Sequence, residues 1–192
     1  HGCSVHWGDT EGDMCGWVET AFIPRYYQNS IEFREDEYPL VMARFSDKGQ
    51  KAKTIEDLKS MIDDYESWVR EIVDPDRFAG DNKATMELHE MRCGESIRRM
   101  REGLAMVERD SATFEAFCFM NKAMLTQRLR YEIAKTYVET HVHQEPEHDD
   151  DGPIWRPFQM AFILQAIPGL VNPGHADREL VDLLWIPTGG GK

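Results

Sequence analysis

The stretch Leu180-Val-Asp-Leu-Leu-Trp-Ile-Pro-Thr-Gly-Gly-Gly-Lys192 decides the fold that we expect for this chain. Residues 180–186 are apolar apart from Asp182, a composition typical of a buried strand. A proline, a threonine, three glycines and a lysine follow immediately. Glycines let backbone N–H groups converge on phosphate oxygens, and a lysine placed after them reaches the terminal phosphates. The stretch therefore predicts a strand that runs into a polyphosphate-binding loop.

The predicted loop departs from the general P-loop, in which a glycine stands six positions before the lysine. Here that position is Ile186, and the run Pro187-Thr188-Gly189-Gly190-Gly191-Lys192 instead resembles the P-T-G-x-G-K loop of superfamily 2 helicases and translocases. A flexible glycine-rich tail with a chance lysine is the alternative. The proline, the threonine and the apolar run before them favour the nucleotide loop.

A second motif, Arg156-Pro157-Phe158-Gln159, lies upstream of the loop. It resembles the R-P-Y-Q element that precedes the P-loop in many superfamily 2 enzymes, and the resemblance implies that Gln159 recognises adenine. Proline is favourable at the first position of a helix, so we expect a helix over 157–167 that stops at Pro168-Gly169. The order of motif, helix, strand and loop is a specific combination.

The segments 155–192 and 2–26 are similar to the helicase-like subunit of DISARM bacterial anti-phage systems, and the helical middle also fits. This resemblance covers essentially the whole chain. It implies a large ATP-dependent DNA motor with two RecA-like lobes, with ATP and Mg²⁺ as cofactors and a subunit of a defence complex as a candidate protein partner. DNA would be held by lobes outside this chain. The residues that the resemblance assigns to ATP binding are Gln159, Thr188, Gly189, Gly190, Gly191 and Lys192, with Lys192 also catalytic.

Several parts of such a motor are not in the sequence. No Ser or Thr follows Lys192 to hold Mg²⁺, and neither an acidic Walker B pair nor an arginine finger is found. The sequence begins with His1 and ends inside a motif, so we expect an internal fragment of a larger protein. We predict that the isolated chain does not hydrolyse ATP.

The composition limits the classes of function. The 192 residues are 41% apolar, but no apolar run approaches the ~20 residues of a membrane span. The formal net charge of −13 makes the chain as a whole a poor nucleic-acid surface, because binding a polyanion needs clustered Lys and Arg. Four scattered cysteines favour a reduced, cytoplasmic location over a disulfide framework.

Cys3, His6 and Cys15 invite a zinc interpretation. A structural zinc site needs four ligands, and no second close pair is present. Ordinary packed or exposed residues are therefore the favoured interpretation, and we predict no metal site.

The predicted fold is mainly α, with a helical accessory domain, a small β-containing N-terminal part and the first helix and strand of a RecA-like P-loop domain. Strands are expected at 16–23 and 40–45, where apolar residues cluster before Pro24 and before a Ser-Asp-Lys-Gly turn. The predicted domains are a β- and loop-rich part at 1–52, the helical accessory domain at 53–142, an acidic, His-containing linker at 143–152 and the start of the helicase lobe at 153–192.

Three long helices are expected in the accessory domain. The helix at 54–73 has an apolar stripe, with Thr54 as its N-cap and Asp74-Pro75 as its end. The helix at 84–109 has a narrow apolar seam that Gly94 and Gly103 weaken. The helix at 111–142 is apolar nearly all round its first half, which predicts the central member of a helical layer.

The run Arg98-Arg99-Met100-Arg101 is the densest basic cluster in the sequence. Contact with phosphate is one interpretation. Glu95 and Glu102 lie within one helical turn, so pairing inside the helix is favoured.

The leading hypothesis is thus an ATP-dependent DNA helicase or translocase of anti-phage defence. One alternative is a restriction-type translocase that moves on duplex DNA without unwinding it. Another is a non-catalytic helical module that docks a partner subunit, which the acidic balance suits. The motor hypothesis requires residues 180–186 to be extended and packed beside the 157–167 helix.

Overall fold

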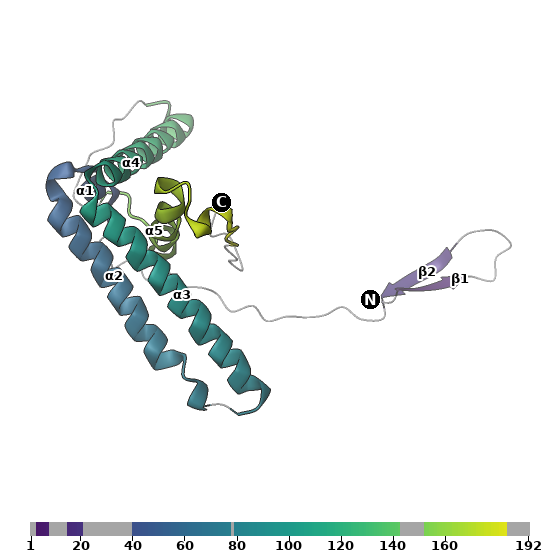
Figure 1. Ribbon diagram of the computed structural model, residues 1–192. Coiled ribbons are helices and arrows are strands. Elements are labelled where there is room, and N and C mark those ends of the chain that lie inside the picture. Colours follow the sequence, from purple (N-terminus) through teal and green to yellow (C-terminus); the bar gives the residue numbers. More distant parts are fainter. Residues whose placement is uncertain (1–2, 8–14, 21–39, 78, 143–151, 184–192) are drawn as a thin grey trace. The chain divides into compact units, whose positions relative to one another are not determined.

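The computed structural model describes residues 3–7, 15–20, 40–77, 79–142 and 152–183 (Figure 1). The chain divides into two compact units, His1–Glu32 with Leu183–Lys192, and Phe33–Asp182. Most described residues are helical, so the predicted mainly α fold class is confirmed. None of the described helices combines the length and the hydrophobicity that crossing a bilayer requires.

Apart from Leu183, the described residues of the first unit form a β-hairpin. Strand β1 (Cys3–Trp7) pairs antiparallel with β2 (Cys15–Thr20), and the register shifts between His6 and Trp7. The second strand lies within the predicted β region, whereas the first was not predicted. The register places Cys3 opposite Thr20 and Cys15 opposite Trp7. The two cysteines therefore stand at opposite ends of the hairpin, roughly 13 Å apart along the strands, which argues against a shared zinc ion.

The strand predicted at 40–45 is wrong. Val41 makes only a single bridge, to Ile154, and helix α1 (Met42–Ser46) follows it. Leu40 and Phe45 are fully buried. A short apolar run is ambiguous between strand and helix, and here one turn of helix buries Phe45 against Phe117, with ring centroids 5.9 Å apart.

Helix α2 (Lys51–Ile72) ends before Asp74-Pro75 as predicted, and the 3-10 turns η1 (Lys48–Gln50) and η2 (Pro75–Arg77) flank it. The prediction that Thr54 caps it is wrong, because the helix starts three residues earlier. The N-cap of α2 is Gln50, which makes no side-chain cap hydrogen bond. Asp47 caps the preceding turn η1, where its Oδ1 accepts a hydrogen bond from the Gly49 N–H at 2.8 Å. Thr54 instead lies fully buried inside the helix, and its Oγ1 finds no hydrogen-bond partner in the described part of the chain.

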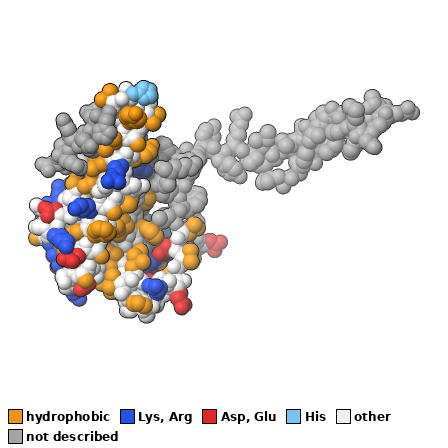
Figure 2. All heavy atoms as spheres, turned by 90° about the horizontal axis from the view of Figure 1, so that it is seen from above, with side chains coloured by type: hydrophobic (Ala, Val, Ile, Leu, Met, Phe, Trp, Pro, Cys, Tyr) orange, Lys and Arg blue, Asp and Glu red, His pale blue; other side chains and the backbone are white. Residues whose placement is uncertain are grey.

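Helix α3 (Asp81–Arg109) occupies the central position in the second unit, where it packs against α2, α4 and α5 (Figure 1). The prediction that the third helix is central is therefore wrong. Helix α4 (Ser111–Thr140) has its last fully buried side chain at Asn121, and Phe119 is 74% exposed. Figure 2, viewed from the side on which α4 lies in Figure 1, shows hydrophobic side chains among lysines and arginines. The apolar composition of α4 thus marks a surface as well as a core.

Helix α5 (Pro157–Val171) crosses α3 at very close range, and Gly103 is the reason. A Cβ atom added at Gly103 would lie 1.9 Å from the Leu164 carbonyl oxygen. Gly103 therefore allows the contact and does not merely weaken its own helix. Pro157 takes the predicted first position, but the predicted end at Pro168 is wrong, since α5 continues through it. Pro168 has no N–H to donate to the carbonyl of Leu164, four residues earlier, and that carbonyl faces Gly103.

Residues on both sides of the predicted 143–152 linker pack into one core. The Trp155 Nε1–H donates to the buried Asn121 Oδ1 at 2.7 Å, and the Met42 N–H donates to the Pro153 carbonyl at 3.0 Å. The described residues 152–182 thus share a compact unit with the helices before the linker. Residues 143–151 of the predicted linker lie outside the described residues, and a separate lobe over 153–192 stays a prediction.

Candidate functional site

The predicted nucleotide-binding residues are only partly described. Thr188, Gly189, Gly190, Gly191 and Lys192 lie outside the described residues. Gln159 lies in the first turn of α5, half-buried, where its Oε1 accepts a hydrogen bond from the Arg156 N–H at 3.1 Å. This bond satisfies one of the free N–H groups at the start of the helix. The role of Gln159 toward adenine stays a prediction.

The strand predicted at 180–186 is wrong over its described half. Residues 180–183 follow the 3-10 turn η3 (Ala176–Glu179) and form no strand. Leu180 has extended backbone angles, but Val181 and Leu183 are 95% and 85% exposed. A buried strand needs neighbouring strands to pair with, and residues 152–183 contain none. Residues 184–186 lie outside the described part of the chain.

Polar contacts to one turn of α3 hold this segment in place. The Arg99 Nε donates to Asp177 Oδ2 at 2.9 Å, and its two terminal nitrogens donate to the two carboxylate oxygens of Asp182, each at 2.8 Å. Because the Asp182 contact is bidentate, it fixes direction as well as distance. We call Arg99, Glu102, His175, Asp177 and Asp182 the α3 anchor.

The ion pairs of the anchor are largely shielded from water. The side chains of Arg99 and Asp177 are only 8% and 9% exposed, and that of Asp182 is 33% exposed. Hydrogen bonding to Asp182 raises the pKa of the Arg99 guanidinium against the opposing effect of burial. The same contact with Arg99 holds the pKa of the Asp182 carboxyl below its usual range. Each of the three nitrogens of the Arg99 guanidinium thus donates a hydrogen bond to a carboxylate.

His175 supplies the second contact of the anchor. Its Nδ1 accepts a hydrogen bond from the Asp177 N–H at 3.1 Å, so the neutral ring carries its proton on Nε2. That Nε2 lies 3.0 Å from Glu102 Oε1, to which it donates. The hydrogen bond with His175, followed by that with Arg98, lowers the pKa of the Glu102 carboxyl. Glu102 and Arg99 are three residues apart and so share one face of α3.

Apolar packing contributes little to holding residues 180–183, since Leu180 is 55% exposed and Val181 and Leu183 are more so. Arg178, two residues before this stretch, makes a further bond, since its Nη1 donates to the Gly169 carbonyl at 2.8 Å. Among the described residues, the α3 anchor is the attachment that reaches farthest toward the predicted loop.

The sequence prediction for the basic cluster is confirmed for one arginine and wrong for two. Arg98 pairs inside its helix with Glu95 and Glu102, as predicted. Arg101 instead reaches Asp63 and Glu66 on α2, and Arg99 reaches residues about 80 positions away. A signal for the Arg99 contact was present in the sequence, because Asp182 is the single polar residue of an apolar run.

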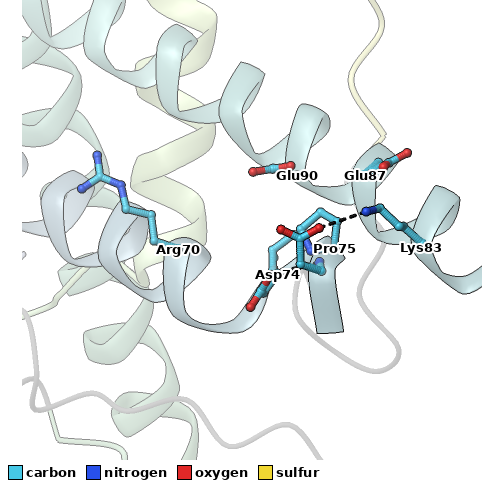
Figure 3. Close-up of a pocket in the computed structure, with 8 residues that line it drawn as sticks. Arg70, Asp74, Pro75, Lys83, Glu87 and Glu90 are labelled. Carbon is cyan, nitrogen blue, oxygen red and sulfur yellow. Dashed lines mark hydrogen bonds and ion pairs between the residues drawn. The ribbon is translucent and has the colours of Figure 1, made fainter. Parts of the chain in front are cut away.

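A hollow of about 390 Å³ lies at the other end of α3, beside η2 and the end of α2 (Figure 3). Four carboxylates and two cations line it, and Lys83 Nζ is already paired with Asp76 Oδ1 at 2.9 Å. An acidic lining does not suit phosphate or nucleic acid. Among the described residues, no group of three or more His, Cys, Asp or Glu side chains is arranged to hold a metal ion. The lining residues are Arg70, Val73, Asp74, Pro75, Asp76, Lys83, Glu87 and Glu90.

Comparison with known proteins identifies a relative over the whole chain. No family model matches. The chain is 33% identical over 206 aligned residues to the DISARM protein DrmA of Bacillus paralicheniformis, an alignment that covers 100% of this chain and 18% of that protein. The predicted resemblance to a DISARM protein is confirmed. The chain spans less than a fifth of the length of this relative.

Proposed function

Because the whole chain aligns with part of a DISARM protein, we propose that it belongs to a larger protein of bacterial anti-phage defence. We propose further that this protein is an ATP-dependent DNA helicase or translocase of the cytoplasm. ATP and Mg²⁺ would bind at the loop that ends in Lys192, with Gln159 toward adenine. The described residues 180–183 do not form the packed strand that the motor hypothesis asks for. The proposal is therefore carried by the end-to-end similarity and by the order of the two motifs in the sequence.

The contribution of this chain to ATP hydrolysis would be positioning and neutralisation of charge. Phosphoryl transfer leaves the protein little covalent chemistry, so backbone N–H groups at Gly189, Gly190 and Gly191 would cradle phosphates while Lys192 offsets their charge. A Walker B carboxylate and an arginine finger would come from the rest of the protein. The isolated chain would therefore not hydrolyse ATP.

The charge of the described helices supports placing most DNA contacts outside this chain. The net charge is −13, and the three arginines of the basic cluster on α3 are all paired with carboxylates. A polyanion would have to displace those carboxylates to reach them. DNA would instead be held by the motor lobes.

The test is ATP hydrolysis by the full-length protein, with and without DNA. Lys192→Ala should lower DNA-stimulated hydrolysis at least about 100-fold, because it removes a charge aimed at the transferring phosphate. Lys135→Ala is a matched control, since Lys135 is exposed and has no ion pair in the described part of the chain. Full-length protein that neither binds nor hydrolyses ATP would contradict the motor proposal.

A second assay sorts helicase from duplex translocase. A helicase should displace one strand of a tailed duplex, whereas a duplex translocase should displace a triplex-forming strand and leave the duplex intact.

A non-catalytic docking module is the second candidate, and the exposed surface of α4 favours it. Phe119, Tyr131 and Val138 are each more than half exposed, as a surface for a protein partner requires. In this case Lys192→Ala should leave phage protection by the complete system unchanged. If Lys192→Ala abolishes protection while α4 variants retain it, docking alone cannot be the function.

A further inference from the structure

We propose that one exposed side of α4 docks an acidic amphipathic helix of another protein. This inference goes beyond the proposed motor, because it assigns a surface and the chemistry of its occupant and does not depend on ATP. It also gives a specific form to the docking module that is the second candidate function.

The second half of α4 leaves the core. Asn121 is fully buried, and its Oδ1 accepts a hydrogen bond from the Trp155 Nε1–H at 2.7 Å. None of the described side chains of α4 after Asn121 is buried. Helices in proteins are stabilised chiefly by the packing of an apolar face. A helix that is anchored over one half and open over the other therefore presents a surface against which a second helix can pack.

Exposed residues of this helix fall on one side at spacings of three and four positions. An aromatic ring stands at each end, since Phe119 is 74% exposed and Tyr137 is 51% exposed. The small side chains of Ala123 and Ala134 lie between them and leave room for the side chains of a facing helix. The row is about 27 Å long, which five turns of a facing helix would cover. We call it the α4 stripe, and its residues are Phe119, Ala123, Thr126, Arg130, Ala134 and Tyr137.

The charge on this side of α4 is positive. Residues 119–140 hold four cations and two carboxylates, whereas the chain as a whole has a net charge of −13. Arg130 lies in the stripe and Lys122 flanks it, and neither has an ion pair in the described part of the chain. The two carboxylates, Glu132 and Glu139, lie about 160° and 180° round the helix from Arg130. A surface that faces the stripe would therefore be complementary in charge if it carried carboxylates.

The balance of apolar and charged groups favours a protein occupant over nucleic acid. Tyr131 and Val138 lie beside the stripe, seven residues apart, and are 59% and 73% exposed. Aromatic side chains around an arginine are typical of protein–protein surfaces. Nucleic acid needs clustered cations, and Lys122 and Arg130 lie about 12 Å apart along the helix axis.

The experiment places a photo-crosslinking residue in the stripe of the full-length protein, expressed in its own host cell. After irradiation, Ala134→benzoylphenylalanine should be joined to another protein. Mass spectrometry of the joined peptide should give a segment with net negative charge and with apolar residues three and four positions apart. Glu139→benzoylphenylalanine, on the opposite side of α4, is the matched control and should give no such product.

Charge reversal tests the chemistry of the contact. Arg130→Glu should lower the crosslinking yield at position 134 at least about 10-fold, because like charges would then face each other. Lys135→Glu makes the same change on an exposed cation about 140° round the helix, so it should leave the yield within about 2-fold of wild type. Exchanging an acidic residue of the joined segment for lysine should restore the yield with the Arg130→Glu protein.

Phe119→Ala tests the apolar part of the contact. It should lower the yield severalfold, and the unfolding temperature should not change, because the Phe119 side chain is largely exposed.

Several results would overturn the inference. They are the absence of a protein product, a product with DNA, with a second copy of this chain or within the same chain, and a joined segment that is not acidic. Equal yields with Arg130→Glu and Lys135→Glu would overturn it as well. ATP hydrolysis by the wild-type protein tests the motor separately, so the two proposals can fail independently.

Discussion

Two groups of cations in the helical unit have opposite surroundings. The arginines of α3 are crowded in sequence and each is paired: Arg98 with carboxylates of its own helix, Arg99 with the 175–182 segment and Arg101 with α2. On α4, Lys122, Arg130 and Lys135 are spread out and exposed, and none has an ion pair in the described part of the chain. The availability of a cation is therefore decided by its neighbours in space, and the densest basic cluster is the least available to a polyanion.

Removing one cation from each group should give the largest contrast. Arg99→Ala leaves the carboxylate of Asp177 buried without its partner, and breaking a buried pair in this way costs about 3–5 kcal/mol in the free energy of unfolding. Arg130→Ala, on the exposed side of α4, should change it by no more than about 0.5 kcal/mol. Urea denaturation followed by circular dichroism measures both, and similar losses would break the comparison.

The close contact beside the α3 group can be tested with two glycines of the same helix. Gly103→Ala puts a methyl group against the Leu164 carbonyl, and this overpacking should cost about 1–3 kcal/mol. A Cβ at Gly94 would meet nothing within 4 Å, so Gly94→Ala should stabilise the helix by up to about 1 kcal/mol. The unfolding temperatures of the two variants should shift in opposite directions. Equal shifts would mean that α5 does not cross α3 at Gly103.

Thr54 tests how much a hydrogen-bond partner matters to the stability of a buried polar group. Arg99 is buried and paired, whereas the buried Thr54 Oγ1 has no hydrogen-bond partner in the described residues. Thr54→Val removes the hydroxyl at nearly constant shape and should stabilise the protein by roughly 1 kcal/mol, because an unsatisfied buried group carries a desolvation penalty. Chemical denaturation measures this gain. A loss of stability would show that the hydroxyl is satisfied in solution.

Acidification should also weaken the ion pairs of the α3 group, with a smaller effect on stability than the substitutions above. Arg99 lowers the pKa of Asp182, and His175 followed by Arg98 lowers that of Glu102. A carboxylate whose pKa is lower in the folded state stabilises the fold above its unfolded pKa, about 4, and that contribution is lost as the pH falls through the folded value. The unfolding free energy should therefore decline below about pH 4. Arg99→Met should make this decline shallower, and an unchanged slope would contradict the assignment.

The helices were the most predictable feature of the chain. The helices at 54–73, 84–109, 111–142 and 157–167 are found in α2, α3, α4 and α5, because apolar periodicity and proline positions report local structure. Their ends were less predictable, since α5 runs through Pro168 once Gly103 of another helix accommodates the Leu164 carbonyl.

The relations between elements could not be predicted from local pattern. The first half of α4 was predicted to be buried on more than one side, yet Phe119 is 74% exposed, because burial depends on which helices lie nearby. The Arg99–Asp182 pair joins residues 83 positions apart, and no periodicity reports such a contact. Of the candidate site, the motifs and the DISARM resemblance came from the sequence, while the anchor that precedes the loop came from the structure.

The most direct test is amide hydrogen exchange of this chain and its Arg99→Met variant, which removes the contacts to both Asp177 and Asp182. The amides of Asp177, Arg178 and Leu180 donate hydrogen bonds within the anchored segment and report its attachment. The variant should lose protection at these three amides while α2 and the first turns of α4 keep theirs. Unchanged protection at Asp177, Arg178 and Leu180 would contradict the claim that Arg99 fastens this segment to α3.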